Sequence, residues 1–172
     1  MAAAVGAGTG VVVAGLGERL AMRLVAAVTP TAAGRLTEAG DTVGSITLDG
    51  TLDVLKMAGV VGAAGGLAYL VARPALPDGA WWRGLGFGVV AAALAMLPTV
   101  EGNRGDFRIL PVALSVLAFA VPIFTYGAVT AATIDRLLGR PSRRYQQRWR
   151  IVLLAVCGLA IVLNIAIFLF TA

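Results

Sequence analysis

The chain has no histidine, a single cysteine (Cys157) and few charged residues. Without histidine it lacks the commonest metal ligand and the commonest general base of enzymes. One cysteine excludes a disulfide within the chain. Charged residues make up only 13% of the sequence, whereas about a quarter is usual in soluble domains. The composition therefore argues against an ordinary soluble domain.

Motifs of common enzymes and nucleotide-binding proteins are also missing. The sequence contains no GxSxG, HExxH, CxxC or P-loop pattern, and its glycine-rich run at 6–10 lies inside an apolar segment. We therefore expect no cofactor and no metal, and a non-enzymatic protein is favoured over an enzyme.

Apolar residues dominate what is present, at 59% of 172 residues with a mean hydropathy of +0.88. A membrane-spanning helix needs about 20 apolar residues. The sequence predicts an all-α membrane protein, a bundle of five transmembrane helices forming one domain over 1–172. The predicted spans are 2–28, 52–72, 81–100, 109–134 and 151–171.

The first span is the shortest in apolar length, because its apolar run covers only 2–17. Leu16, Leu20, Leu24 and Val28 continue the helical pattern at four-residue spacing, so we interpret 2–28 as one helix that Thr29-Pro30 ends. A signal peptide is the alternative, but the run lacks a basic start. A start codon placed too late, which removes a basic N-terminus, is the other.

The orientation follows from the loop at 135–150, because cytoplasmic loops are enriched in Lys and Arg. Asp135 and six arginines there account for the whole net charge of +5. We expect these arginines to contact anionic lipid headgroups at the cytoplasmic face. They are Arg136, Arg140, Arg143, Arg144, Arg148 and Arg150. The sequence thus predicts a plasma-membrane protein with a cytoplasmic N-terminus, an extracytoplasmic C-terminus and no nucleic-acid partner.

The longest predicted extracytoplasmic segment is the loop at 29–51. Its residues 43–48 are rich in β-prone side chains and Asp49-Gly50 is a turn signal, which predicts a short hairpin cap. Thr51 is the expected N-cap of the next helix, with Asp53 in the first turn.

Charged side chains near the outer ends of the first two spans form a possible polar site. They are Glu18, Arg19, Arg23, Asp53 and Lys56. Interfacial salt bridges are the simpler interpretation. Glu18 is also the nearest carboxylate for a third hypothesis, an enzyme acting on lipid.

A cavity beside the fourth span is the other candidate site. Pro122 frees a backbone carbonyl inside this span and kinks it. Polar side chains near the kink could line the cavity or rebond the freed backbone. They are Thr125, Tyr126 and Thr130, together with Asn164 of the fifth span, which more simply bonds a neighbouring helix.

Small residues at four-residue spacing recur as Gly6/Gly10, Gly62/Gly66 and Gly84/Gly88. In lipid such pairs allow helices to pack closely. They fit either a homodimer interface or packing within the bundle.

Three stretches carry a resemblance to a family: ERLAMRL at 18–24, VGSITLDGTL at 43–52 and NRGDF at 103–107. In these the chain resembles a group of small, uncharacterised actinobacterial integral membrane proteins. The resemblance covers most of the chain and implies no activity or site residues. The leading hypothesis is a non-enzymatic membrane protein that packs against lipid, a second copy or a membrane partner. A small-molecule transporter or binding protein is the alternative.

Overall fold

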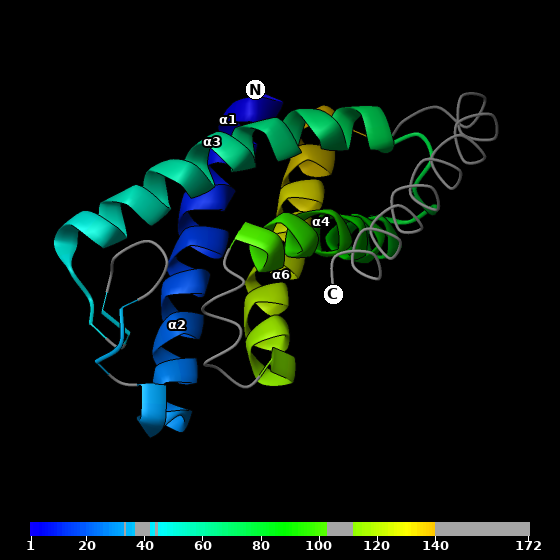
Figure 1. Ribbon diagram of the computed structural model, residues 1–172. Helices are drawn as coiled ribbons and strands as arrows, with labels where there is room; N and C mark the ends of the chain where they lie inside the picture. Colours follow the sequence, from blue (N-terminus) through cyan, green and yellow to red (C-terminus); the bar gives the residue numbers. More distant parts are fainter. Residues whose placement is uncertain (33, 37–41, 44, 103–111, 140–172) are drawn as a thin grey trace.

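The computed structural model describes residues 1–32, 34–36, 42–43, 45–102 and 112–139, and most of these are helical (Figure 1). The prediction of an all-α fold is confirmed for this part of the chain. The elements are α1 (Ala2–Thr9), η1 (Gly10–Gly15), α2 (Leu16–Val28), η2 (Pro30–Ala32), α3 (Leu48–Ala72), α4 (Ala80–Gly102) and α6 (Val112–Leu138).

The first three elements follow one another without a break, so 2–28 is a single helical rod. Its middle, η1, is π-helical, a feature that no sequence pattern indicated. Thr29 leaves the helical conformation (φ −128°, ψ 70°), as expected for a residue that precedes proline. The leucine stripe of α2 faces outward, with Leu20 71% exposed, while Ala21 and Val25 are buried.

Helix α3 begins four residues before its predicted start at 52, and the predicted cap is wrong. Thr47 is the N-cap: its extended backbone lets its hydroxyl accept a hydrogen bond from the Gly50 N–H at 3.2 Å. Asp49 and Gly50 therefore form the first helical turn instead of a hairpin turn. In the preceding loop, the described residues Leu36 and Thr42 form an isolated antiparallel bridge.

Helix α6 ends four residues after the predicted boundary at 134, so that Asp135 and Arg136 are helical instead of lying in a loop. Gly139 follows the helix with φ +71°, a left-handed conformation that glycine adopts without strain and that often terminates helices. Asp135 is buried, and its polar contacts, described below, stabilise this last turn.

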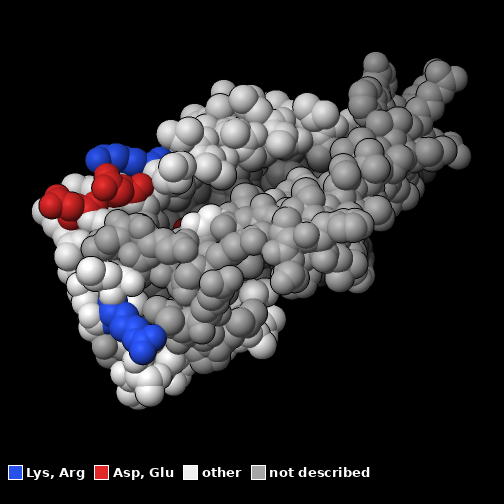
Figure 2. All heavy atoms as spheres, in the orientation of Figure 1, with Lys and Arg blue, Asp and Glu red and all other residues white. Residues whose placement is uncertain are grey.

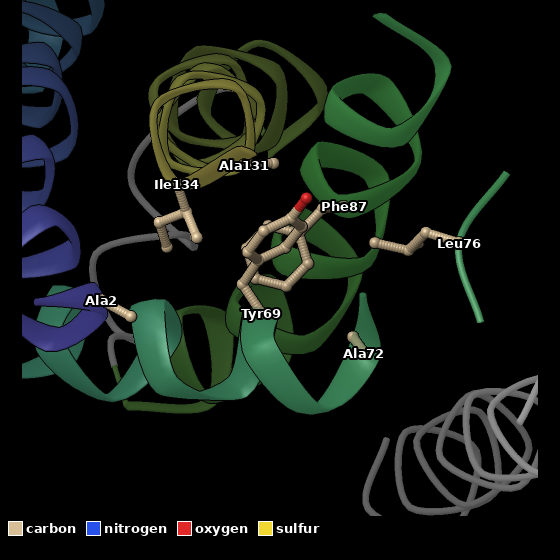
Figure 3. Close-up of a cluster of buried hydrophobic side chains, with 7 residues drawn as sticks. All are labelled: Ala2, Tyr69, Ala72, Leu76, Phe87, Ala131 and Ile134. Atoms are coloured by element: carbon tan, nitrogen blue, oxygen red, sulfur yellow. The ribbon is translucent and has the colours of Figure 1, made fainter. Parts of the chain in front are cut away.

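The helices pack as crossing pairs. The rod α1–η1–α2 runs beside α6, α3 crosses the rod, and α4 packs on α6 (Figure 1). A small apolar core joins α1, α3, α4 and α6 (Figure 3). At its centre Tyr69 is fully buried, and its ring meets Phe87 edge-on at a centroid distance of 4.9 Å.

Glycine allows these close crossings. A Cβ atom added at Gly6 would lie 2.2 Å from the carbonyl oxygen of Gly62, and one at Gly66 would lie 2.3 Å from that of Ala2. On the other pair, a Cβ at Gly88 would lie 2.6 Å from the carbonyl oxygen of Phe124. All three predicted glycine pairs thus contact helices of the same chain, as the intramolecular alternative requires.

Two helices in the described part are long and apolar enough to cross a membrane: Leu48–Ala72 and Ala113–Leu138. In their most apolar windows only 17% and 28% of residues are buried, whereas the core helix of a soluble protein would be mostly buried. The apolar stretch of α4, Ala80–Met96, is shorter. Because only two of the described helices qualify as spans and residues 151–171 lie outside the described part, the five-span bundle is not confirmed and stays a prediction.

The outer face of α3 shows this apolar character. Figure 2 shows a red and a blue group of side chains where α3 begins and a second blue group below them, whereas the rest of α3 is drawn in white, without charge. The large apolar residues that are more than half exposed beyond the first turns of the helix are Met57, Val60, Val61, Leu67 and Val71.

Candidate functional site

A buried carboxylate, Asp135 near the end of α6, is the centre of an ionic cluster that joins three helices. Its Oδ1 accepts hydrogen bonds from the Tyr69 hydroxyl at 2.7 Å and from Arg73 Nε at 2.8 Å. Its Oδ2 accepts one from Arg83 Nη1 at 2.5 Å. Arg83 is only 3% exposed.

The turn between α3 and α4 positions the two arginines. Arg73 is the residue at which α3 ends. Gly79 then adopts φ +100°, and its carbonyl accepts a hydrogen bond from the Arg83 N–H at 2.9 Å. The chain thereby reverses within a few residues. Arg83, in the first turn of α4, is returned to the same carboxylate as Arg73.

The cluster holds two guanidinium groups against one carboxylate, and helix ends contribute to its balance. The C-terminal end of a helix carries roughly half a negative charge, and α3 and α6 both end here. Arg73 also donates from Nη2 to the carbonyl of Gly139, just beyond α6. One arginine therefore caps α6 while it pairs with Asp135.

This arrangement is suited to holding helices and not to proton transfer. A general base must reach the proton of a substrate, but both oxygens of Asp135 already accept hydrogen bonds and its side chain is 7% exposed. Among residues 1–139, outside the gaps given above, no group of three metal-ligating side chains occurs either. The cluster holds α3, α4 and α6 together.

The sequence interpretation missed this site, because it placed Asp135 and Arg73 in loops and Arg83 near the start of the span at 81–100. Asp135 and Arg73 are separated by 62 positions, and no local pattern links them. One signal was available: the predicted topology puts the loops at 73–80 and 135–150 on the same membrane side. Opposite charges at the ends of helices on one side are candidates for an ion pair.

The predicted outer polar cluster is divided by the structure. Asp53 and Lys56 form an exposed pair at 3.0 Å on α3. Arg19 is buried, and its Nη2 donates to the Thr51 hydroxyl at 3.0 Å and to the Thr47 carbonyl at 3.5 Å. Glu18 is partly buried and Arg23 is exposed.

Two residues of the predicted cavity, Tyr126 and Thr130, contact other helices. The Tyr126 hydroxyl donates to the Gly62 carbonyl at 2.7 Å, and Thr130 shares a hydrogen bond of 2.6 Å with Thr9. Thr125 is exposed and donates to the carbonyl of Val121, one turn earlier in α6. These contacts join the rod and α3 to α6.

The remaining predicted site residues are Pro122, Asn164 and the six loop arginines. Pro122 is buried, and a Cβ at Gly17 would lie 2.7 Å from its side chain. Asn164 lies outside the described residues. Of the six loop arginines, Arg136 is exposed in the last turn of α6, and the other five lie outside the described part.

The geometry thus consists of apolar outer faces, glycine-mediated helix crossings and a buried ionic cluster that ties three helix ends together. Comparison with protein-family models, with curated proteins and with solved structures finds no match.

Proposed function

We propose that the chain is a multi-pass integral plasma-membrane protein with a non-enzymatic, structural or accessory role. The observation that carries the proposal is the middle of α3, where Met57, Val60 and Val61 are more than half exposed. In water, exposed apolar surface costs about 25 cal/mol per Å², whereas lipid imposes no such cost. Lipid is therefore the solvent that suits this face.

The inside of the helix packing supports the same proposal. Apolar side chains face outward, while glycines, hydroxyls and the Asp135 cluster face other helices. Helices in lipid associate through close packing of small residues and hydrogen bonds between helices, because hydrophobic burial gives little advantage there. The described helices show both kinds of contact.

The proposed orientation places the ionic cluster at the cytoplasmic side. Trp81 and Trp82 are exposed at the start of α4, directly before Arg83 of the cluster. Exposed tryptophan side chains are favoured in the headgroup layer. Arg136 directly follows Asp135 and is exposed, so it would then meet anionic headgroups. Membrane lipids are the proposed partners, with a second copy or another membrane protein as further ones.

Val60→Asp tests the proposal. Val60 is 70% exposed at the midpoint of α3. A carboxylate at the centre of a membrane helix costs about 2.5–3.5 kcal/mol for insertion, so we expect a clear loss of protein from the membrane fraction after alkaline carbonate washing. Wild type should resist this wash and dissolve only in detergent.

Leu48→Asp is the matched control, because Leu48 is equally exposed but begins the helix. An acidic residue there is favourable for the helix dipole, so insertion should be unchanged. A soluble protein would give the opposite result: Val60→Asp would be harmless, and wild type would leave the membrane on washing.

A small-molecule carrier is the second candidate function, and one observation favours it. The π-helical segment η1 directly follows Thr9, whose hydroxyl meets Thr130 in the interior. Such π-helical turns often occur at functional sites. The rod and α6 are in contact at this segment, so a change in η1 would alter the Thr9–Thr130 contact.

Cysteine labelling separates the two functions. In a Cys157→Ser background, we expect Thr130→Cys to resist a membrane-impermeant thiol reagent, because Thr130 is fully buried. Thr125→Cys, which faces outward on the same helix, controls for position: lipid around it should block labelling as well. Labelling at 130 without labelling at 125 would reveal a water-filled path and favour the carrier.

A further inference from the structure

Arg19 in α2 is buried like Arg83, but its surroundings differ. It is 9% exposed, and its guanidinium lies against the first turn of α3 through the contacts with Thr47 and Thr51. Among the described residues, its Nη1 donates only to the sulfur of Met22 at 3.6 Å, and its Nε is buried without a hydrogen-bond partner. Arg19 therefore uses few of its five donors on strong acceptors.

Comparison with the Asp135 cluster shows that Arg19 lacks a counter-ion among the described residues. There each arginine contacts a carboxylate within 2.8 Å, whereas the described residues give Arg19 no ion pair. A buried cation without a counter-ion is strongly unfavourable. Glu18 precedes Arg19 directly, and neighbouring residues on a helix do not face each other.

The first turn of α3 adds to the positive potential at this place. A helix N-terminus carries roughly half a positive charge and unbonded N–H groups. The Gly50 N–H is capped by Thr47, and the Thr51 N–H bonds to the Thr47 carbonyl. Among the described residues, no backbone carbonyl accepts from the N–H groups of Leu48 and Asp49, as is usual in the first turn of a helix.

From this geometry we propose that Arg19 and the N-terminus of α3 bind a phosphate group. Arginine suits phosphate because its planar donors match two oxygens at once, and a helix N-terminus offers backbone donors to the same anion. The Thr51 hydroxyl accepts from Arg19 Nη2 at 3.0 Å and donates its own proton to the Thr47 carbonyl at 2.7 Å, so it orients the guanidinium group and leaves the phosphate to the other Arg19 donors. The source is either free inorganic phosphate or a lipid headgroup, and the site does not depend on the proposed membrane function.

Acidic neighbours set limits on this site. The charge of Asp53 is matched by Lys56. Asp49 lies in the same first turn of α3 and opposes an anion, so Asp49→Asn should strengthen binding. Glu38 and Asp41 of the preceding loop lie outside the described residues, and a Glu38→Gln/Asp41→Asn variant tests whether either serves as the counter-ion.

The experiment measures binding to the purified full chain in a neutral detergent. Inorganic phosphate is titrated against thermal stability at constant ionic strength. Phosphatidylglycerol is added separately in mixed micelles, with phosphatidylcholine for comparison, and bound lipid is counted by native mass spectrometry. Stabilisation by phosphate alone identifies the free ion, and stabilisation by phosphatidylglycerol alone identifies a headgroup; either result supports the site.

Arg19→Gln should weaken binding about tenfold or more, which corresponds to the loss of one charge-assisted hydrogen bond. Arg23→Gln is the matched control, because it removes the same charge one turn further along the same helix, where the side chain is exposed. Its affinity should change less than about twofold, as for a screened surface charge.

Two results would overturn the proposal. Equal weakening by Arg19→Gln and Arg23→Gln would indicate non-specific attraction to surface charge. No stabilisation of wild type by either probe, with Glu38→Gln/Asp41→Asn as destabilising as Arg19→Gln, would indicate a counter-ion within the chain. If Arg19→Gln does not fold, stronger binding by Asp49→Asn decides for the site and unchanged binding decides against it.

Discussion

Asp135→Asn should lower the free energy of unfolding by about 3–5 kcal/mol, the usual cost of removing one partner from a buried ionic contact. The substitution keeps the shape of the side chain but leaves Arg73 and Arg83 without their shared carboxylate. Arg83 is almost fully buried, so solvent cannot replace the lost charge. Denaturation of the purified protein in mild detergent, followed by circular dichroism, measures the change.

The matched control for this prediction is Asp53→Asn. Its ion pair with Lys56 is 74% exposed on the carboxylate side, and exposed pairs contribute about 0–1 kcal/mol. The double variant Asp135→Asn/Arg83→Met should cost less than the sum of the single changes, because it no longer leaves Arg83 as a buried cation. Equal, small effects of Asp135→Asn and Asp53→Asn would show that the cluster does not hold the helices together.

Gly62→Val is the second change with a large expected effect, a loss of about 3 kcal/mol or more from overpacking. A Cβ atom at Gly62 would lie 2.4 Å from the carbonyl oxygen of Gly6 and 2.9 Å from the Cα of Gly10. These are backbone atoms of the neighbouring helix, so no side-chain rotation can relieve the contact. The same denaturation measurement reports the loss, and α3 must separate from the rod to accommodate valine.

Gly8→Ala provides the control of opposite sign. It lies on α1 between Gly6 and Gly10, yet an added Cβ would meet no atom within 4 Å. Replacing an unconstrained helical glycine by alanine stabilises a helix by roughly 0.5–1 kcal/mol. Destabilisation by Gly8→Ala, or tolerance of Gly62→Val, would show that α1 and α3 do not cross at these glycines.

Local features of the fold were predictable from the sequence for a local reason. Apolar length and helical spacing predicted helices at 2–28 and near 52–72, and the Thr29-Pro30 step predicted where the first one ends. Helix ends were less predictable. Thr47, and not Thr51, caps α3 because its backbone is extended, and two threonines four residues apart offer the same local signal.

The candidate sites were predictable only as sets of residue types. The sequence grouped Arg19 with Asp53 and Lys56 by their positions near helix ends, but the pair on α3 is exposed and Arg19 is buried against Thr51. Tyr126 and Thr130 were expected beside a kink, and they hydrogen-bond to other helices. Which face of a helix turns inward depends on its neighbours, and no single segment carries that information.

The sequence by itself determined the all-helical class and the apolar lengths, because helix formation and hydropathy are properties of neighbouring residues. Only the tertiary structure decided that Asp135 lies between Arg73 and Arg83, since those pairs are 62 and 52 positions apart. It also decided that the leucine stripe of α2 faces outward and its small residues inward. The physical reason is that helices cross closely where glycine and alanine remove bulk, and this crossing fixes which charges can meet.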